Sequence, residues 1–181
     1  MANEIKSNIN KSQEFLKKKD FNNAELILLK NLEITNDSFE TFFLLGTISG
    51  IKNDLVRAEN YLKKANNLNS SHINCFLNLA IIQKKMNKKN DSINSFEKVL
   101  KLDRNNLESL CGLAQIFEED ENFNMAEIYF KKVLEIDSNH HIANHSYGKL
   151  LLKLNQHSKG LKLIEKVSGI IRLEKEILKI I

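Results

Sequence analysis

Apolar residues recur along the chain with the spacing of one face of an α-helix, and residues 107–140 show this most clearly. A first set stands at positions i, i+3, i+4 and i+7, which predicts a helix with one apolar face. After a polar break at residues 118–122, a second set predicts another such helix. The two sets are Leu110, Leu113, Ala114 and Phe117, and then Phe123, Ala126, Phe130, Val133 and Leu134. The segment therefore predicts two amphipathic helices joined by a short turn.

This two-helix pattern returns every 34 residues along most of the chain. A small residue recurs at the same interval in the second helix, which indicates that the two helices cross closely there. These residues are Ala24, Ala58, Ser92, Ala126 and Gly160, and the five units are 5–38, 39–72, 73–106, 107–140 and 141–174. One pair of helices cannot bury both of its apolar faces, so successive pairs must stack. The sequence thus predicts an all-α solenoid of five helix-turn-helix repeats.

Asparagine marks the predicted turn between the two helices of several units. Asn53, Asn87 and Asn155 stand at the polar break of the second, third and fifth units. Asparagine tolerates the left-handed backbone conformation that often ends a helix, so we expect it to take the place that glycine usually has.

The chain resembles the tetratricopeptide repeat family in this period and in two residue pairs. Leu113-Ala114 matches the Leu-Gly or Leu-Ala pair of the family's first helix, as do Leu45-Gly46 and Leu79-Ala80. Ala126 with Phe130 matches the later pair, a small and a large apolar residue four positions apart. The family's frequent proline is missing, since the chain contains none. The resemblance implies a right-handed superhelical solenoid whose first helices line a concave surface.

The C-terminal residues predict a further helix. Ile170, Leu173, Ile177 and Ile181 form one helical stripe, and residues 175–181 would be the end of a capping helix that covers the last repeat. Ile171 and Leu178 lie off this stripe. The alternative is therefore an incomplete edge that binds a partner or a second copy of the chain.

Composition narrows the class of function. Lysine and arginine number 27 and aspartate and glutamate 23, a net charge of +4 without a concentrated basic face, so no nucleic-acid partner is expected. The sequence lacks an apolar stretch of membrane-spanning length and the apolar core of a signal peptide, so no membrane partner is expected. Two cysteines form no disulfide framework, and the chain is expected in the cytoplasm.

The resemblance also points to a candidate binding groove. The fifth position of each repeat faces the concave surface in the family and is not needed for the core. Here that position is mostly apolar, with Ile81 one turn further on, and would line a groove for an extended peptide or a helix. The alternative is that these residues only pack against neighbouring helices. The column consists of Ile9, Phe43, Leu77, Cys111 and His145.

Three other kinds of site receive less support. One is a charged edge formed by the lysines between residues 84 and 89 and the acidic residues at 118–121, which we expect to neutralise each other. The alternative is a bipolar docking edge. Lys88 is expected to be a dispensable surface residue. Only Asn78 matches the clamp with which some family members hold a C-terminal carboxylate. His141 and His145 have the spacing of a helical metal pair but lack further ligands, so no metal site is expected.

These observations predict a non-catalytic scaffold that binds a protein or peptide on its concave face. No cofactor is expected, because the chain has neither a phosphate-binding glycine loop nor a cysteine beside a positioned histidine at a helix start. The alternative is a substrate-recognition or regulatory arm of a larger enzyme or complex, with the catalytic part on another polypeptide segment.

Overall fold

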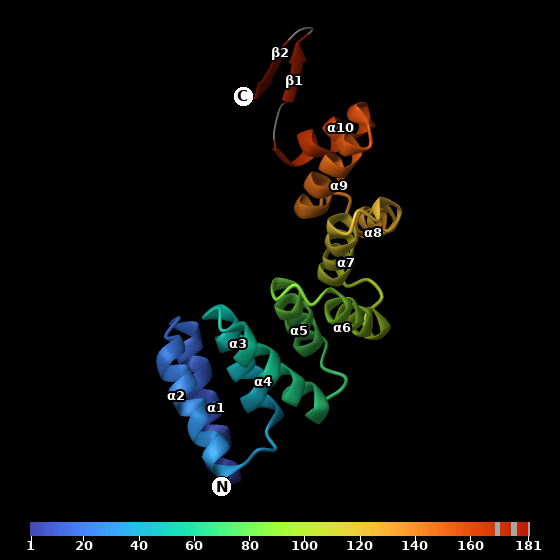
Figure 1. The fold of residues 1–181 in the computed structure, drawn as a ribbon. Coiled ribbons are helices and arrows are strands. Elements are labelled where there is room, and N and C mark those ends of the chain that lie inside the picture. Colours follow the sequence, from blue (N-terminus) through green and yellow to red (C-terminus); the bar gives the residue numbers. More distant parts are fainter. Residues whose placement is uncertain (169–170, 175–176, 181) are drawn as a thin grey trace. The chain divides into compact units, whose positions relative to one another are not determined.

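The computed structural model describes residues 1–168, 171–174 and 177–180 of the chain (Figure 1). This part holds ten α-helices followed by two short strands. The helices are α1 (Ala2–Lys17), α2 (Phe21–Ile34), α3 (Phe39–Ile51), α4 (Leu55–Leu68), α5 (Ile73–Lys85), α6 (Lys89–Leu102), α7 (Leu107–Glu119), α8 (Phe123–Ile136), α9 (His141–Lys153) and α10 (His157–Ser168), and the strands are β1 (Ile171–Glu174) and β2 (Ile177–Ile180). The predicted all-α repeat fold is confirmed for α1 to α10.

The chain forms two compact units, Met1–Lys98 and Val99–Ile181. In the first unit α1 packs on α2 and α3 on α4, and α5 packs against α4. In the second unit α7 packs on α8 and α9 on α10. Each unit therefore repeats the helix-turn-helix pair that the apolar pattern predicts.

One residue in the left-handed conformation lies between the two helices of every pair in the described chain. Asn53, Asn87 and Asn155 have φ angles of 61°, 58° and 60°, which confirms the prediction for them. Lys19 and Glu121 take the same place with φ angles of 59° and 57°, although residues of these types seldom adopt it. The packing of the paired helices therefore imposes this turn even where the residue type does not favour it.

The small residues predicted at the helix crossings are buried in all five pairs. At the crossing of α9 and α10, Gly148 faces Gly160. A Cβ atom added at Gly148 would lie 2.8 Å from the backbone oxygen of Gly160, and one added at Gly160 would lie 2.7 Å from that of Gly148. The two backbones approach so closely that only glycine fits at both positions without a shift of a helix.

The core of the second unit is built around Phe130 of α8. Its side chain is fully buried, and its ring stacks on that of Tyr147 with 5.9 Å between the centroids. Leu110 and Ala114 of α7 and Leu150 of α9 belong to the same cluster. This cluster joins α7, α8 and α9, so it stabilises both the pair and its contact with the next helix.

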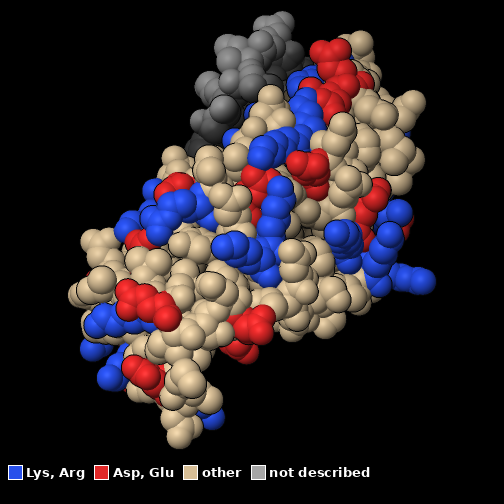
Figure 2. All heavy atoms as spheres, turned by 60° about the horizontal axis from the view of Figure 1, so that its bottom comes forward, with Lys and Arg blue, Asp and Glu red and all other residues tan. Residues whose placement is uncertain are grey.

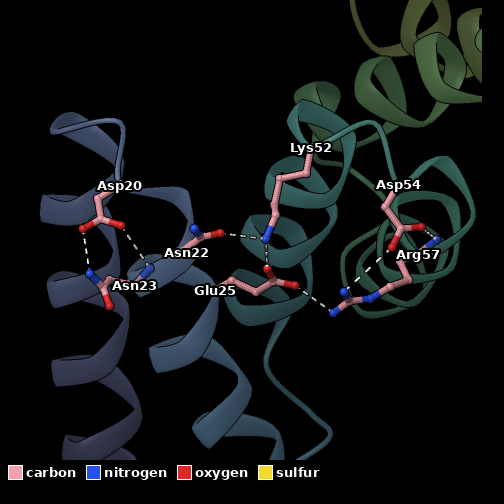
Figure 3. A network of polar contacts seen from close by, with 7 residues as sticks. All are labelled: Asp20, Asn22, Asn23, Glu25, Lys52, Asp54 and Arg57. Carbon is pink, nitrogen blue, oxygen red and sulfur yellow. Dashed lines mark hydrogen bonds and ion pairs between the residues drawn. The ribbon is translucent and has the colours of Figure 1, made fainter.

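Two buried glutamates connect successive helix pairs in the first unit, and Figure 3 shows the contacts of one of them, Glu25. The Glu25 carboxylate on α2 is 2.7 Å from Lys52 Nζ and 2.8 Å from an Arg57 guanidinium nitrogen, and both cations belong to the next pair. Glu59 on α4 contacts Lys63 at 2.8 Å and also Lys88. Lys88 thus contacts a carboxylate whose residue is only 4% exposed, and the expectation that Lys88 is dispensable stays a prediction.

Burial and the neighbouring cations have opposite effects on the pKa of the Glu25 and Glu59 carboxyl groups. Burial disfavours the charged form and by itself would raise the pKa. The hydrogen bonds and charges of the neighbouring lysines, with Arg57 at Glu25, outweigh burial, and the pKa of both groups lies below the ordinary value of 4.5. Both glutamates are therefore charged in the folded chain at neutral pH.

These lowered pKa values predict a loss of stability in acid. A carboxyl group with a lower pKa in the folded state stabilises the fold above its unfolded pKa, and this contribution disappears as the pH falls through the folded pKa. We expect the urea midpoint, followed by circular dichroism, to fall as the pH drops below about 4.5. The Glu25→Gln/Glu59→Gln variant should start lower at pH 7 and fall less steeply in acid.

The matched control replaces two exposed glutamates, Glu33→Gln/Glu135→Gln. Its stability at pH 7 should stay within about 0.5 kcal/mol of the wild type. If the Glu25/Glu59 variant is as stable as this control and keeps the acid slope of the wild type, the buried pairs do not contribute to stability.

The C-terminal capping helix predicted from residue 170 to the end is wrong where the structure describes this region. β1 and β2 pair as antiparallel strands, with Ile171 opposite Ile180 and Glu174 opposite Ile177 (Figure 1). Residues 169–170, 175–176 and 181, on which the rest of the predicted helix falls, lie outside the described residues. Isoleucine is β-branched and favours strands, and residues 171–174 also alternate apolar and polar types, so the pattern fits a strand as well as a helix. The self-association predicted at this end of the chain stays a prediction.

Candidate partner-binding cleft

In the first unit, Phe43 of the predicted groove column has close packing contacts. Its ring stacks on Phe39 at 5.7 Å between centroids and lies 4.8 Å from the ring of His72, at the start of α5. It also packs against the core cluster of this unit. Leu77 on α5 is half-buried. Part of the Phe43 ring is thus already covered by this chain.

Cys111 and His145 of the same column lie in the second unit. Cys111 is 6% exposed and belongs to the core cluster around Phe130, so it offers little surface to a partner. Burial, with a smaller effect from the charge of Glu108, raises the pKa of its thiol to about 11. The thiol therefore stays protonated at neutral pH and is a poor nucleophile. His145 is half-buried on α9.

A small open cleft lies between α3 and α5, the first helices of two successive pairs. Its volume is about 200 Å³, and its lining includes Gly46 and Gly50 on α3 and Leu62 of α4. Ile51 of α3 and Ile81 of α5 also line it, and these side chains are 54% and 39% exposed. The cleft therefore brings two large apolar side chains from different helix pairs to one surface depression.

Polar groups also line this cleft. The Asn78 side-chain amide donates a hydrogen bond to Thr47 Oγ1 at 3.2 Å, and the Thr47 hydroxyl donates to the backbone oxygen of Phe43 at 2.9 Å. Lys85, the last residue of α5, lines it as well. Thr47 and Asn78 thus fix α3 against α5 beside the exposed isoleucines.

The sequence identified Ile81 of this cleft but missed Ile51. Ile51 lies eight residues after Phe43, two turns along the same helix, and outside the apolar stripe that packs on α4. An apolar residue off the core stripe near a helix end was the available signal. The predicted Ile9 lines a different cleft, of about 740 Å³, together with Ile5, Ile34, Asp37 and Glu40.

The charged clusters near the inter-helix turns have partners inside the chain. Lys88 pairs with Glu59, and Glu118 pairs with Lys153 at 3.2 Å. Figure 2 shows lysine and arginine interspersed with aspartate and glutamate on the face that it displays. Lys88 and Glu118 are thus paired with residues other than those of the opposite cluster, and the neutralised edge and the bipolar docking edge both stay predictions.

His141, one of the two histidines with the spacing of a helical metal pair, and the adjacent His140 have other neighbours. His141 Nε2 lies 3.1 Å from the backbone oxygen of Val167, and His140 Nδ1 accepts a hydrogen bond from the Ala143 backbone at the start of α9. Within the described ranges, no group of three or more potential ligand residues is placed to hold a metal ion. Nor does any helix in those ranges have the length and apolar character needed to cross a membrane.

Stacked helix pairs with close small-residue crossings and a left-handed turn in each pair define a helical repeat protein. The sequence model of the tetratricopeptide repeat matches residues 73–106 and 107–140, which are the third and fourth units expected from the period. The chain therefore contains tetratricopeptide repeats, and the resemblance is confirmed. The bounds of the other units stay predictions.

Solved structures of repeat proteins share this fold. The crystal structure of MamA has a TM-score of 0.80 at 18% identity, over 86% of this chain and 91% of that one. A tetratricopeptide repeat protein from Parabacteroides merdae has 0.80 at 20% identity, over 89% and 64%. YrrB, described as a TPR protein with an unusual peptide-binding site, has 0.76 at 18% identity, over 88% and 82%. A comparison with curated protein sequences finds no match.

Proposed function

We propose that this chain is a non-catalytic scaffold that binds an extended segment of a partner protein in the cleft between α3 and α5. The observation that carries the proposal is the exposure of Ile51 and Ile81 on this cleft, at 54% and 39%. Covering large apolar side chains that are exposed in a depression removes apolar surface from water, which favours binding of a partner. YrrB, a protein of the same fold, is described as having a peptide-binding site, which supports the same class of function.

The size of the cleft favours a protein segment over a small molecule. Sites for small molecules usually measure about 300–1,000 Å³. A cleft of about 200 Å³ suits one apolar side chain, with the rest of a peptide lying along the first helices. Of the predicted groove residues we take Ile81 into this proposal, and the roles of Phe43, Leu77, Cys111 and His145 in binding stay predictions. The alternative of a recognition or regulatory arm of a larger enzyme or complex also stays a prediction.

The proposal is tested with a displayed library of random linear peptides, selected on the immobilised full chain. The wild type should enrich apolar-containing peptides, and the Ile51→Glu/Ile81→Glu variant should lose this enrichment, because carboxylates in the cleft would be desolvated beside the apolar side chain. Ile128→Glu is the matched control, since Ile128 is 46% exposed on α8 and lies in the other unit. Circular dichroism would check that all variants fold.

Equal enrichment by the wild type and the cleft variant would refute binding in this cleft. Absence of any enrichment by the folded wild type would do the same. Concentration-dependent dimers that the Ile81→Glu change dissociates would assign the cleft to a second copy of the chain instead.

A further inference from the structure

We infer that the cleft between α3 and α5 selects an extended peptide in which a large apolar residue is separated by one residue from an aspartate or glutamate. This inference rests on the proposed function and adds the chemistry of the partner. Two features carry it, namely the order of the cleft residues along the helices and the sign of the charge that they bring.

The lining residues of α5 follow one another by about one turn. Asn78 comes first and is hydrogen-bonded to Thr47, Ile81 and Ile82 come next, and Lys85 ends the helix. Along α3, Ile51 follows Thr47 by four residues. The apolar part of the cleft therefore lies between the hydrogen-bonded pair Thr47 and Asn78 and the side-chain ammonium group of Lys85.

The end of this cleft carries a positive charge. Lys85 is the cation among the described lining residues, and those residues include no carboxylate. The larger cleft near α1 differs, since its lining combines Lys6 with Asp37 and Glu40. The smaller cleft is therefore complementary to a carboxylate placed beside an apolar side chain, whereas the larger one favours neither sign.

The preference for an acid depends on the single side chain of Lys85. The last turn of a helix carries a partial negative charge from its free carbonyl groups, which would repel a carboxylate. Lys85 is exposed at that turn and reverses the local charge. A change of its charge should consequently change the sign of the residue that the cleft selects.

The spacing in the peptide follows from helix and strand geometry. Ile81 and Lys85 are four residues apart, which corresponds to about 6 Å along α5. In an extended peptide, residues i and i+2 point to the same side and lie about 6.6 Å apart. When an apolar side chain of a peptide that runs along α5 lies between Ile51 and Ile81, the peptide side chain two residues further on therefore lies beside Lys85.

The test repeats the library selection with the wild type, Lys85→Glu and Lys30→Glu. Lys30 is exposed on α2, so the control makes the same change of net charge away from the cleft. The wild type and Lys30→Glu should enrich an acidic residue two positions from an apolar one, and Lys85→Glu should enrich a basic residue there. Displayed peptides carry the motif internally, so the carboxylate is that of a side chain and not of a peptide terminus.

A selected peptide, synthesised with both ends blocked, then supplies a double-mutant cycle. Replacing its acidic residue by the corresponding amide should weaken binding to the wild type by roughly twofold to fivefold, as expected for an exposed ion pair, and should leave binding to Lys85→Gln nearly unchanged. The difference should shrink at high ionic strength.

Each outcome separates this inference from the proposed function. Enrichment that depends on Ile51 and Ile81 but shows no acidic preference would overturn the inference and leave the function standing. An acidic preference that persists in Lys85→Glu would also overturn it. Loss of dependence on the isoleucines would overturn both.

Discussion

Replacing Phe130 by alanine is expected to lower the free energy of unfolding by about 3–5 kcal/mol. The Phe130 side chain is fully buried and lies between α7, α8 and α9, with its ring stacked on Tyr147. Its removal loses the transfer free energy of the ring and leaves a cavity that three packed helices cannot close. Urea unfolding followed by circular dichroism measures the effect.

Two variants of the same helix serve as controls. Ile128→Ala removes an apolar side chain that is 46% exposed only two residues away, and it should change the stability by no more than about 0.5 kcal/mol. Phe130→Leu keeps most of the apolar volume and should cost less than Phe130→Ala. If Ile128→Ala and Phe130→Ala have equal midpoints, the helical faces assigned from the apolar period are wrong.

The sequence predicts the paired helices well because each pair repeats the same local rules. The small residue at the crossing, such as Ala126, and the asparagine at the turn, such as Asn87, each have a direct steric cause. Both kinds of residue are confirmed in their places. Glu121 shows the limit of this reasoning, since its left-handed conformation follows from the packing of α7 against α8 and not from its own preference.

The C-terminal segment could not be assigned from its pattern alone. Leu173 fits a helical stripe when it is read with Ile177, whereas Ile171 and Leu173 fit one face of a strand when they are read with their neighbours. The choice between the two depends on pairing with residues 177–180, which is a contact between segments and not a property of either one. A β-branched run without clear caps was the signal that favoured strands.

The candidate site was only partly predictable for a related reason. The repeat period assigns a residue to a helix face, but it does not say which residues of two first helices surround a depression. Ile81 was identified by its place one turn after Leu77, whereas Ile51 required the relative position of α3 and α5. The contact of Lys88 with Glu59 is likewise not predictable from the period, because the burial of Glu59 depends on how the next pair stacks.

Phe43 and Ile81 should separate a packing role from a binding role within the first unit. Phe43→Ala is expected to lower the free energy of unfolding by about 2–3 kcal/mol, less than a fully buried phenylalanine would, because its ring is half-buried between Phe39 and His72. Ile81→Ala should keep the stability within about 0.5 kcal/mol, since its side chain is 39% exposed.

The two variants should show the opposite order in binding. With a peptide selected on the wild type, Ile81→Ala should weaken the affinity by about 1 kcal/mol or more, as the loss of an apolar anchor does. Phe43→Ala, measured at a temperature where it is folded, should bind nearly as the wild type does, because its ring contacts residues of its own chain. Isothermal titration calorimetry and urea unfolding on the same preparations give both quantities. A Phe43→Ala protein of unchanged stability that no longer binds the peptide would instead place the predicted column, and not the cleft at Ile51 and Ile81, at the centre of recognition.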